Sequence, residues 1–325
     1  MLSTPHEAGE IECLSAGLLV ADHLCTPISH LPRAGELVLA DRLELTIGGC
    51  ASNVAIDLAR LGVRVAAVGC VGRDSFGEFV IDTLQRSGVD TRSIRQLDDV
   101  ATSGTLIVNV AGEDRRFIHA IGANGRLAVE HVPIDRLLAS RVFYVGGYFV
   151  LPGLDPGRLA ALFRQARSAG VKTVLDVVMS GPGDHWPQLR ELLRETDVFL
   201  PNVDEAAIIT GHDNPREQAL RLHDAGARTV VITCGGEGTV VVGERERLHA
   251  PAHKVTFVGG TGAGDAFDAG FIAGLIEGAD VRRCLEWGSA LGASCVRSIS
   301  ATESVFTRAE ALEFMRTHPL RVAEW

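Results

Sequence analysis

The segment TFVGGTGAGDAF, residues 256–267, decides how the fold of this 325-residue chain is interpreted. Four glycines lie within residues 259–264, and Asp265 follows them directly. The preceding KVTFV has the pattern of a strand, and the following AGDAFDAGFIAGLIEG has the pattern of a helix. Backbone N–H groups at such a helix start can hold an anion without a lysine, because glycine lets a phosphoryl group approach the main chain.

The chemistry of this loop differs from that of the common nucleotide-binding motifs. The chain contains no Gly-Lys pair, which excludes a P-loop, and Phe267 stands where G-x-G-x-x-G needs its third glycine. Asp265 would repel a resting phosphate, but in phosphoryl transfer to an alcohol a carboxylate is expected to accept the hydroxyl proton. The loop therefore reads as an anion hole with a base. The structural alternative is a capping aspartate with packing glycines, and the loop alone does not decide between them.

Outward from this loop, apolar runs alternate with amphipathic stretches along most of the chain. Strands are predicted at 11–22, 63–72, 141–147, 171–177, 197–202 and 228–234. Helices are predicted at 52–62, 76–88, 156–170 and 215–226, each closed by a glycine, and the region 263–318 is predicted to be mainly helical. The alternation predicts an α/β fold, with a doubly wound, mostly parallel sheet flanked by helices.

Two regions depart from this alternation. Residues 35–47 and 103–121 alternate polar and apolar side chains, and AGED (111–114) divides the second region as a hairpin turn would. They favour a small antiparallel β lid, formed by approximately 23–47 and 102–121 and inserted in a single domain that spans 1–325. An ordinary extension of the sheet edge is the alternative.

Composition excludes several classes of function. The chain is 46% hydrophobic and 22% charged with a net charge of −10, so it has no basic surface for nucleic acid or an anionic membrane. The seven cysteines show no C-x-x-C spacing, which favours free thiols in a reducing compartment. The polar N-terminus and the lack of a long apolar run predict a cytoplasmic protein.

Other polar motifs follow predicted strands. TCGGEG (233–238) ends one strand with glycines and a threonine hydroxyl, as a nucleotide-binding turn or a plain hairpin would. In PNVDE, Asn202 and Glu205 can organise Mg²⁺, although a helix capping box explains both residues equally well. In IGGCASN, Asn53 follows a second Gly-Gly turn, and Asp22 lies at the end of the first predicted strand, where α/β sheets place ligands.

Together and in this order, these motifs resemble those of the ribokinase-like (PfkB) family of sugar and nucleoside kinases. GTGAGDAF is the most specific element, followed by GGCASNVAIDLARLG, with support from GRDSFG, GAN, PNVDEA and TCGGEG. The resemblance runs from SAGLLVAD to SCVRSISA, nearly the whole chain. It implies a ribokinase-like fold with a β lid, and transfer of the γ-phosphoryl group of ATP to a hydroxymethyl group with Mg²⁺.

The resemblance also implies residue roles at matching positions. The catalytic set is Asp265 as base, with Gly262, Ala263 and Gly264 as the anion hole. The acceptor-binding set is Asp22, Gly48, Gly49, Asn53 and Asn124. The nucleotide-binding set is Asn202, Thr233, Gly235, Gly238 and Thr261, and the segment 288–295 is expected near the adenine. Glu205 would hold Mg²⁺ through water.

The chain departs from the family pattern at several positions. Members often carry D-T-x-G-A-G-D, whereas Gly259 and Gly260 replace the Asp and Thr here. That Asp is associated with a monovalent-cation site, so a requirement for such a cation is doubtful. Ribokinases proper also carry an Asn, a Lys and a pocket Glu where this chain has Val20, Cys50 and Gly147. Free ribose is therefore not the first expectation for the acceptor.

We therefore expect an ATP-dependent kinase of a sugar or sugar derivative. A nucleoside kinase with the same fold is the alternative, and lid residues such as Phe117 or His119 would decide between the two acceptors. A catalytically silent sugar or nucleotide sensor is a third hypothesis, from a different class. The exposed strands of the lid favour a homodimer formed through the lid.

Overall fold

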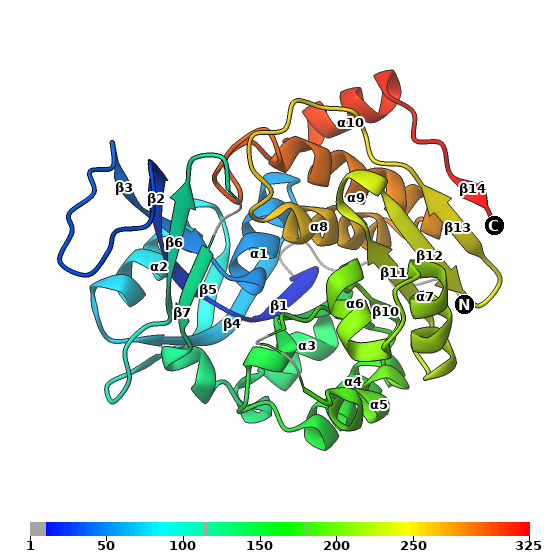
Figure 1. The fold of residues 1–325 in the computed structure, drawn as a ribbon. Helices are drawn as coiled ribbons and strands as arrows, with labels where there is room; N and C mark the ends of the chain where they lie inside the picture. Colours follow the sequence, from blue (N-terminus) through cyan, green and yellow to red (C-terminus); the bar gives the residue numbers. More distant parts are fainter. Residues whose placement is uncertain (1–10, 114–115, 180, 182) are drawn as a thin grey trace.

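The computed structural model describes residues 11–113, 116–179, 181 and 183–325, and therefore not Asp114 of the predicted AGED turn. Figure 1 shows a long twisted sheet with helices on both faces and a small second sheet at one end. This confirms the predicted α/β architecture, a mostly parallel, doubly wound sheet with a separate small sheet. Among the described residues, no helix combines the length and apolarity needed to cross a membrane.

The large sheet is parallel through most of its width. Its strands, in spatial order, are β14 (Ala323–Glu324), β13 (Arg247–Ala250), β12 (Thr239–Gly243), β11 (Thr229–Thr233), β10 (Val198–Phe199), β9 (Lys172–Leu175), β8 (Val142–Gly146), β1 (Cys13–Gly17), β4 (Val65–Gly72) and β5 (Asp90–Leu97). The strands from β11 to β5 pair in parallel, and β12–β14 add an antiparallel edge. Every residue of β4 is buried, as its continuous apolar sequence predicts.

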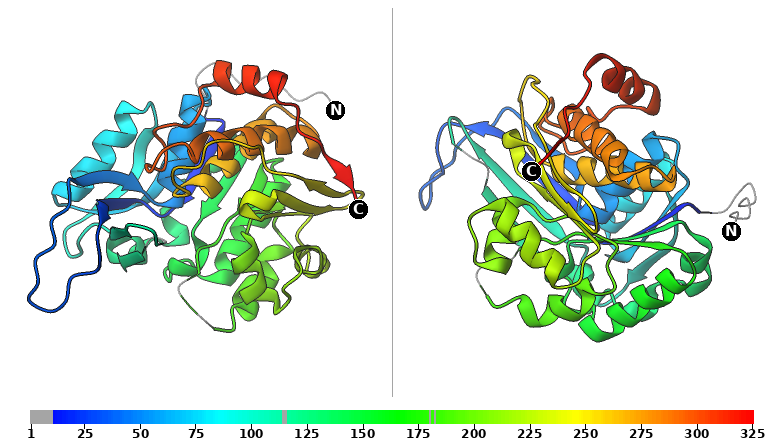
Figure 2. Two further views of the ribbon diagram at one scale, coloured as in Figure 1. Left: turned by 45° about the horizontal axis from the view of Figure 1, so that its top comes forward. Right: turned by 90° about the vertical axis from the view of Figure 1, so that its right-hand side faces the viewer.

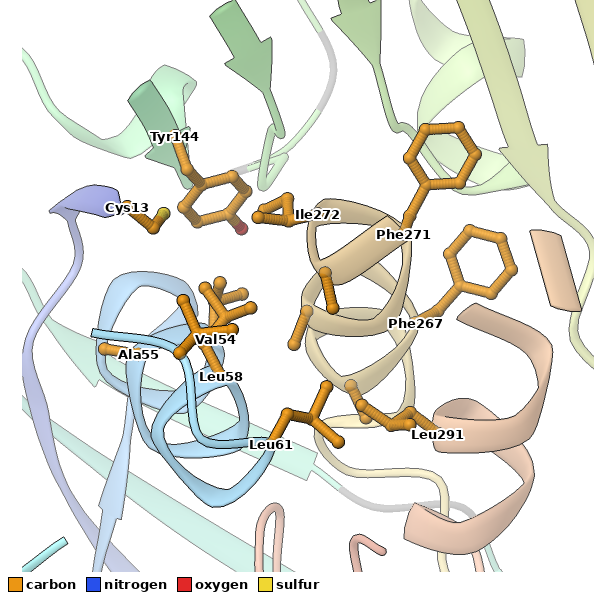
Figure 3. Close-up of a cluster of buried hydrophobic side chains, with 14 of the residues drawn as sticks. Cys13, Val54, Ala55, Leu58, Leu61, Tyr144, Phe267, Phe271, Ile272 and Leu291 are labelled. Atoms are coloured by element: carbon orange, nitrogen blue, oxygen red, sulfur yellow. The ribbon is translucent and has the colours of Figure 1, made fainter. Parts of the chain in front are cut away.

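Helices cover both faces of the sheet (Figure 2). Each face has its own apolar core. One face carries α1 (Cys50–Arg60), α2 (Ser75–Arg86), α8 (Ala263–Ile276), α9 (Val281–Cys295) and α10 (Arg308–Thr317). The other carries α3 (Ile134–Ala139), α4 (Pro156–Ser168), α5 (Trp186–Leu193), α6 (Val203–Thr210) and α7 (Pro215–Asp224). Figure 3 shows the first core, where Val54 and Leu58 of α1, and Leu61 directly after it, lie beside α8.

The small sheet has the strand order β3 (Leu43–Gly48), β2 (Val20–Ile28), β6 (Gly104–Val110) and β7 (Arg116–Ala120). Its two outer pairs are antiparallel, as predicted, whereas the middle pair β2–β6 is parallel. The alternation over residues 35–47 gives a strand only from Leu43, so the extended strand pattern expected before it was wrong. Leu37 and Leu39 are 81% and 83% exposed, so the alternation before Leu43 has no neighbouring strand to pack on.

The single strand predicted at 11–22 is two strands in two sheets. β1 ends at Gly17, where φ is 139° and a Cβ atom would lie 2.1 Å from the carbonyl oxygen of Gly146. This close approach to β8 requires glycine, and the chain leaves the large sheet there. Asp22 therefore belongs to β2 of the lid, and its predicted place at the end of a strand of the large sheet was wrong.

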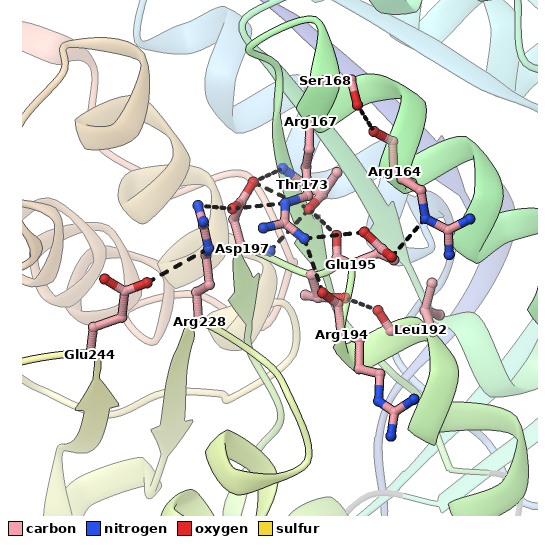
Figure 4. A network of polar contacts seen from close by, with 11 residues as sticks. Arg164, Arg167, Ser168, Thr173, Leu192, Arg194, Glu195, Asp197, Arg228 and Glu244 are labelled. Carbon is pink, nitrogen blue, oxygen red and sulfur yellow. Dashed lines mark hydrogen bonds and ion pairs between the residues drawn. The ribbon is translucent and has the colours of Figure 1, made fainter.

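A network of ion pairs fixes the amino ends of β9, β10 and β11 (Figure 4). Arg167 contacts Glu195 at 3.2 Å and Asp197 at 3.3 Å, and Arg228 contacts Asp197 at 3.3 Å. Asp197 also accepts the backbone N–H of Thr173 at 3.0 Å. The loops at the opposite, carboxyl ends of these parallel strands carry the polar motifs predicted to bind ligands.

Candidate functional site

The glycine loop leads directly into α8, as predicted. Gly262 is the N-cap residue, with φ 77° and ψ 0°, and a Cβ atom there would lie 2.6 Å from the carbonyl oxygen of Ala301. Glycine is required by both the backbone conformation and the space. A Cβ atom on Gly264 would meet nothing within 4 Å, so the first turn of α8 has an open side. Its N–H groups there offer an anion site, with Asp265 in the same turn.

Asn53 brings the second glycine motif to this helix start. Its Nδ2 donates a hydrogen bond to Oδ2 of Asp265 at 2.8 Å, and its side chain is buried. The two residues are 212 positions apart in the chain. Burial raises the pKa of Asp265, while the hydrogen bonds from Asn53 and Cys50 lower it. The contact orients the carboxylate of Asp265 at the start of α8.

The Gly48-Gly49 turn makes room for the lid carboxylate. A Cβ atom on Gly48 would lie 1.9 Å from Oδ2 of Asp22, and one on Gly49 would lie 2.5 Å from the carbonyl oxygen of Leu18. Larger residues here would push Asp22 away from α1. Asp22 therefore lies against the turn that leads into α1, the helix that carries Asn53.

Asp22 is part of a polar row across the lid. Strand pairing places Thr46, Asp22, Thr105 and His119 side by side on the same face. His119 Nδ1 lies 3.1 Å from Thr105 Oγ1. Burial raises the pKa of Asp22 to about 6, the hydrogen bond from Thr105 opposes this rise, and the charge of Asp265 adds to it. The lid thus presents a buried carboxylate and a histidine to the same space.

Asn202 and Glu205 form the capping box at the start of α6. Oδ1 of Asn202 accepts the N–H groups of Asp204 and Glu205, and Oε2 of Glu205 accepts the N–H of Asn202 at 2.9 Å. The interpretation of Asn202 and Glu205 as a helix capping box is therefore correct. Glu205 nevertheless lies near other negatively charged groups. Burial raises the pKa of Glu205 to about 7, and the negative charges of Asp265 and Asp204 add to the rise.

The predicted nucleotide turn lies next to this box. A β-bridge joins Asn202 to Thr233, whose N–H also donates to the carbonyl oxygen of Pro201 at 3.2 Å. The backbone of Gly238 has φ 95°, and a Cβ atom there would lie 2.0 Å from the carbonyl oxygen of Ala250. Gly235 has no atom within 4 Å of a built Cβ position, so its side of the turn is open.

The remaining predicted site residues lie around these elements. Asn124 is fully buried, and its side-chain amide is used by both the N–H and the carbonyl oxygen of Leu19, at 3.1 and 3.0 Å. It therefore holds the chain before Asp22, and we do not assign it a contact with an acceptor. The carbonyl oxygen of Thr261 accepts the thiol of Cys295 at 3.3 Å, which ties the loop to the predicted adenine segment 288–295 on α9.

Two of the departures from the family pattern, Gly259 and Gly147, lie in tightly packed places. A Cβ atom on Gly259 would lie 2.9 Å from the carbonyl oxygen of Ser298, so this packing leaves no room for an aspartate. Gly147 has φ 79°, a backbone conformation that a glutamate would adopt only with strain, and a Cβ atom there would lie 2.4 Å from Cδ1 of Leu18, which would have to move.

Asp176 is a site residue that sequence reasoning missed. It lies just after β9, and ligand atoms of Cys50, Asp176 and Asp265 are all within 4.8 Å of one another. The sequence contained a pattern that could have identified Asp176, because VLDV (174–177) places a carboxylate at the carboxyl end of a predicted parallel strand. Burial and the charges of Glu205 and Asp265 raise the pKa of Asp176.

Comparison with known proteins assigns the family. Residues 11–308 match the model of the pfkB family of carbohydrate kinases. The chain belongs to this family. It is 30% identical to a ribokinase of Haemophilus influenzae over 306 residues, which cover 92% of this chain and 96% of that protein. It is 31% identical to an aminoimidazole riboside kinase of Salmonella typhimurium over 266 residues, which cover 78% of this chain and 79% of that protein.

Solved structures show the ribokinase-like fold of this pfkB chain. The ribokinase of Arabidopsis thaliana, solved with ribose and ATP, superimposes with a TM-score of 0.81 at 22% identity over 94% of this chain and 99% of that one. A putative ribokinase II of E. coli, solved with ATP and Mg²⁺, gives 0.80 at 23% identity over 95% of this chain and all of that one. The chain is therefore a sugar or nucleoside kinase of the pfkB family.

Proposed function

We propose that the whole chain acts as one ATP-dependent kinase domain that phosphorylates a hydroxymethyl group of a sugar or sugar derivative. The hydrogen bond between Asn53 and Asp265 carries this proposal, because it unites an acceptor-binding helix with the start of the anion-binding helix. Asp22 on the lid lies against the same turn, through Gly48. Three distant parts of the sequence thus meet around one carboxylate, as a transfer to a hydroxyl group requires.

In the proposed reaction, Asp265 accepts the proton of the acceptor hydroxyl. The oxygen of that hydroxyl attacks the γ-phosphorus of ATP at the same time. The new oxygen–phosphorus bond forms as the bond to the β-bridging oxygen breaks, and ADP leaves. The N–H groups of Ala263 to Asp265 face the charge on the transferred phosphoryl group. Asn53 holds Asp265 in position, and Asp22 accepts a hydrogen bond from another hydroxyl of the acceptor.

Glu205 fits a role in holding Mg²⁺. Its carboxylate is oriented by the N–H of Asn202, and the charges that raise its pKa are negative, so a divalent cation would offset them. One carboxylate with several waters is a common setting for Mg²⁺. When bound with ATP, the ion neutralises part of the phosphate charge. Asn202, Thr233, Gly235 and Gly238 would contact the nucleotide beside it.

The acceptor is the open part of this proposal. Relatives are named for a ribokinase, an ATP-dependent 6-phosphofructokinase, a 5-dehydro-2-deoxygluconokinase and an aminoimidazole riboside kinase. The tightly packed positions at Gly147 and Gly259 argue against the ribokinase pocket and its cation site. We place a modified sugar first and a nucleoside second. For the nucleoside, His119 and Phe117, which share one face of β7 in the lid, would offer a ring surface to the base.

A coupled assay of ADP release, run over sugars, sugar phosphates, sugar acids and nucleosides, tests the proposed function. We expect turnover with one class of acceptor and none without an acceptor. Tight ATP binding with no turnover on any class would instead support the sensor hypothesis.

The KM for the acceptor should depend on pH through Asp22. Its pKa is raised to about 6, so Asp22 is an anion above this pH and becomes a protonated carboxyl below it. The protonated form no longer accepts a hydrogen bond as a charged group, and KM should rise about tenfold for each pH unit below 6. Asp22→Asn should have a high KM at every pH and no such dependence. An unchanged pH dependence of KM in this variant would contradict the assignment.

We also propose that the chain forms a homodimer through the lid. On the face opposite Asp22, strand pairing aligns Leu45, His23, Leu106 and Ile118, and the three apolar members are 39%, 41% and 66% exposed. A continuous exposed apolar row favours association. Light scattering should give a dimer for the natural chain and a monomer for Leu106→Lys. Leu312→Lys on α10, where the leucine is 42% exposed, is the matched control and should stay dimeric.

A further inference from the structure

A buried tyrosine links two carboxyl groups beneath the candidate base. Oη of Tyr144 lies 3.3 Å from Oδ2 of Asp176 and 3.3 Å from Oδ2 of Asp268. Tyr144 belongs to β8, Asp176 follows β9, and Asp268 lies one turn after Asp265 on α8. All three side chains are buried. Figure 3 shows Tyr144 extending from β8 toward the space between α1 and α8.

The space for this hydroxyl depends on a glycine. A Cβ atom on Gly146 would lie 2.6 Å from Oη of Tyr144 and 2.7 Å from Cβ of Cys50. Any larger residue would displace the hydroxyl or the cysteine. The arrangement of Tyr144, Cys50 and the two carboxyls is therefore built into the carboxyl end of β8.

The number of hydrogen atoms determines which hydrogen bonds Asp176, Tyr144 and Asp268 can form. A tyrosine hydroxyl has one hydrogen, so it can donate to only one of the two carboxyl groups. The other carboxyl must donate to the hydroxyl, and it therefore carries a proton. Two ionised carboxylates around one hydroxyl would leave an uncompensated charge in a buried site.

The donors around each carboxyl decide which one is ionised. Asp176 is approached by the N–H of Gly147 at 3.3 Å and by the thiol of Cys50, in addition to Tyr144. Asp268 has only Tyr144 among the hydrogen bonds found for the described residues. The Cys50 thiol has one hydrogen and also lies against Asp265, so it is not counted as a donor of Asp176 alone. Asp176 still has the N–H of Gly147 and the hydroxyl of Tyr144, whereas Asp268 has Tyr144 alone, so the proton belongs on Asp268, in the order Asp268 to Tyr144 to Asp176.

On the basis of the proposed function, we propose that Tyr144 and the protonated Asp268 are positioning residues that hold Asp176 as an anion beside the catalytic base Asp265. The ligand atoms of Asp176, Cys50 and Asp265 lie within 4.8 Å of one another, so the charge on Asp176 disfavours ionisation of Asp265. This strengthens Asp265 as a proton acceptor, because a base works best when its pKa approaches the working pH.

The electrostatic surroundings of Asp176 come from five other groups. Glu205 of α6 and both Asp265 and Asp268 of α8 are acidic, whereas Cys50 of α1 and Tyr144 of β8 are neutral donors. Burial and the neighbouring acidic groups raise the pKa of both Asp176 and Asp268. A change in charge at Asp176 is therefore felt directly at Asp265.

The test uses Asp268→Asn, Asp176→Asn and Tyr144→Phe in the full chain, with the pH profile of kcat at saturating acceptor and ATP, because the titration of Asp22 is expected in KM and not in kcat. Asp268→Asn keeps a neutral donor to Tyr144, so its acid limb should coincide with that of the natural chain. Asp176→Asn should move the acid limb to lower pH by about one unit or more, because the like charge beside Asp265 is gone. Tyr144→Phe should move it in the same direction. A shifted limb for Asp268→Asn, or an unshifted one for Asp176→Asn, would overturn the proposal.

An infrared measurement separates this proposal from the proposed function, because it needs no turnover. The natural chain at neutral pH should show the carbonyl stretch of a protonated buried carboxyl. Difference spectra should show the loss of this band in Asp268→Asn and its retention in Asp176→Asn. The reverse pattern would overturn the proton assignment even if the kinase activity is found. The expected pattern in a chain that phosphorylates no acceptor would refute only the proposed function.

Discussion

Asp265→Asn is expected to lower kcat by about 10²–10⁴-fold, the range that a general base contributes. The asparagine fills the same space and can still contact Asn53, but it cannot accept the proton of the acceptor hydroxyl. The affinity for ATP should stay near that of the natural chain, because the N–H groups at the start of α8 are unchanged. Steady-state kinetics and calorimetric titration of ATP measure the two effects separately.

A surface variant controls for the change of charge in this experiment. Asp82→Asn removes one exposed carboxylate of α2, which pairs with Arg86 of the same helix, and should leave kcat unaltered. Substantial turnover by Asp265→Asn would show that another group accepts the proton. A parallel loss of ATP affinity would show that the substitution had disturbed the helix start as a whole.

Gly262→Ala is expected to lower kcat by about 10²–10³-fold, which is the effect of losing one donor to a developing charge. The residue has φ 77°, and its new Cβ atom would lie 2.6 Å from the carbonyl oxygen of Ala301. Either the first turn of α8 or the segment at Ala301 must move, and in both cases the N–H groups lose their direction. Kinetics, together with the midpoint of thermal unfolding, measure this result.

Gly278→Ala is the matched control at the other end of the same helix. Gly278 has φ 73°, and a Cβ atom there would meet nothing within 4 Å. This variant should lose about 1–2 kcal/mol of unfolding free energy from the left-handed backbone alone and keep its turnover. Equal losses of kcat in the two variants would mean that stability, and not the geometry of the anion site, accounts for the effect.

Local patterns predicted most of the fold. The helices expected at 52–62, 76–88, 156–170 and 215–226 are present with ends within two residues of those predicted, once each closing glycine is set aside. The glycine loop and the Asn202–Glu205 box have the local structure that their spacing indicates, because short-range backbone hydrogen bonds determine both.

Long-range packing limited the rest. The apolar run 11–22 does not reveal that the chain changes sheets after Gly17, because a close approach to Gly146 causes the change. Asp268 lies in the apolar helix AGDAFDAGFIAG, and its partner Tyr144 lies in an apolar strand. The sequence pattern does not single out either residue, because the two side chains meet only when β8, β9 and α8 pack together. The neighbours of Asp176 were hidden for the same reason.

The crossing from β1 to β2 spans only Leu18 and Leu19, and Asn124 holds both backbone groups of Leu19. If the small sheet turned about this connection, Asp22 on β2 would move with it, whereas Asn53 on α1 and Asp265 on α8 would stay with the large sheet. Such a movement would separate Asp22, the proposed acceptor-binding carboxylate, from Asp265, the proposed base. A water molecule has no second hydroxyl group with which to contact Asp22 while it contacts Asp265. Water would therefore not favour the position of the lid that brings the two carboxylates together. The short connection at Leu18 and Leu19 would then favour transfer to the acceptor over hydrolysis of ATP by water.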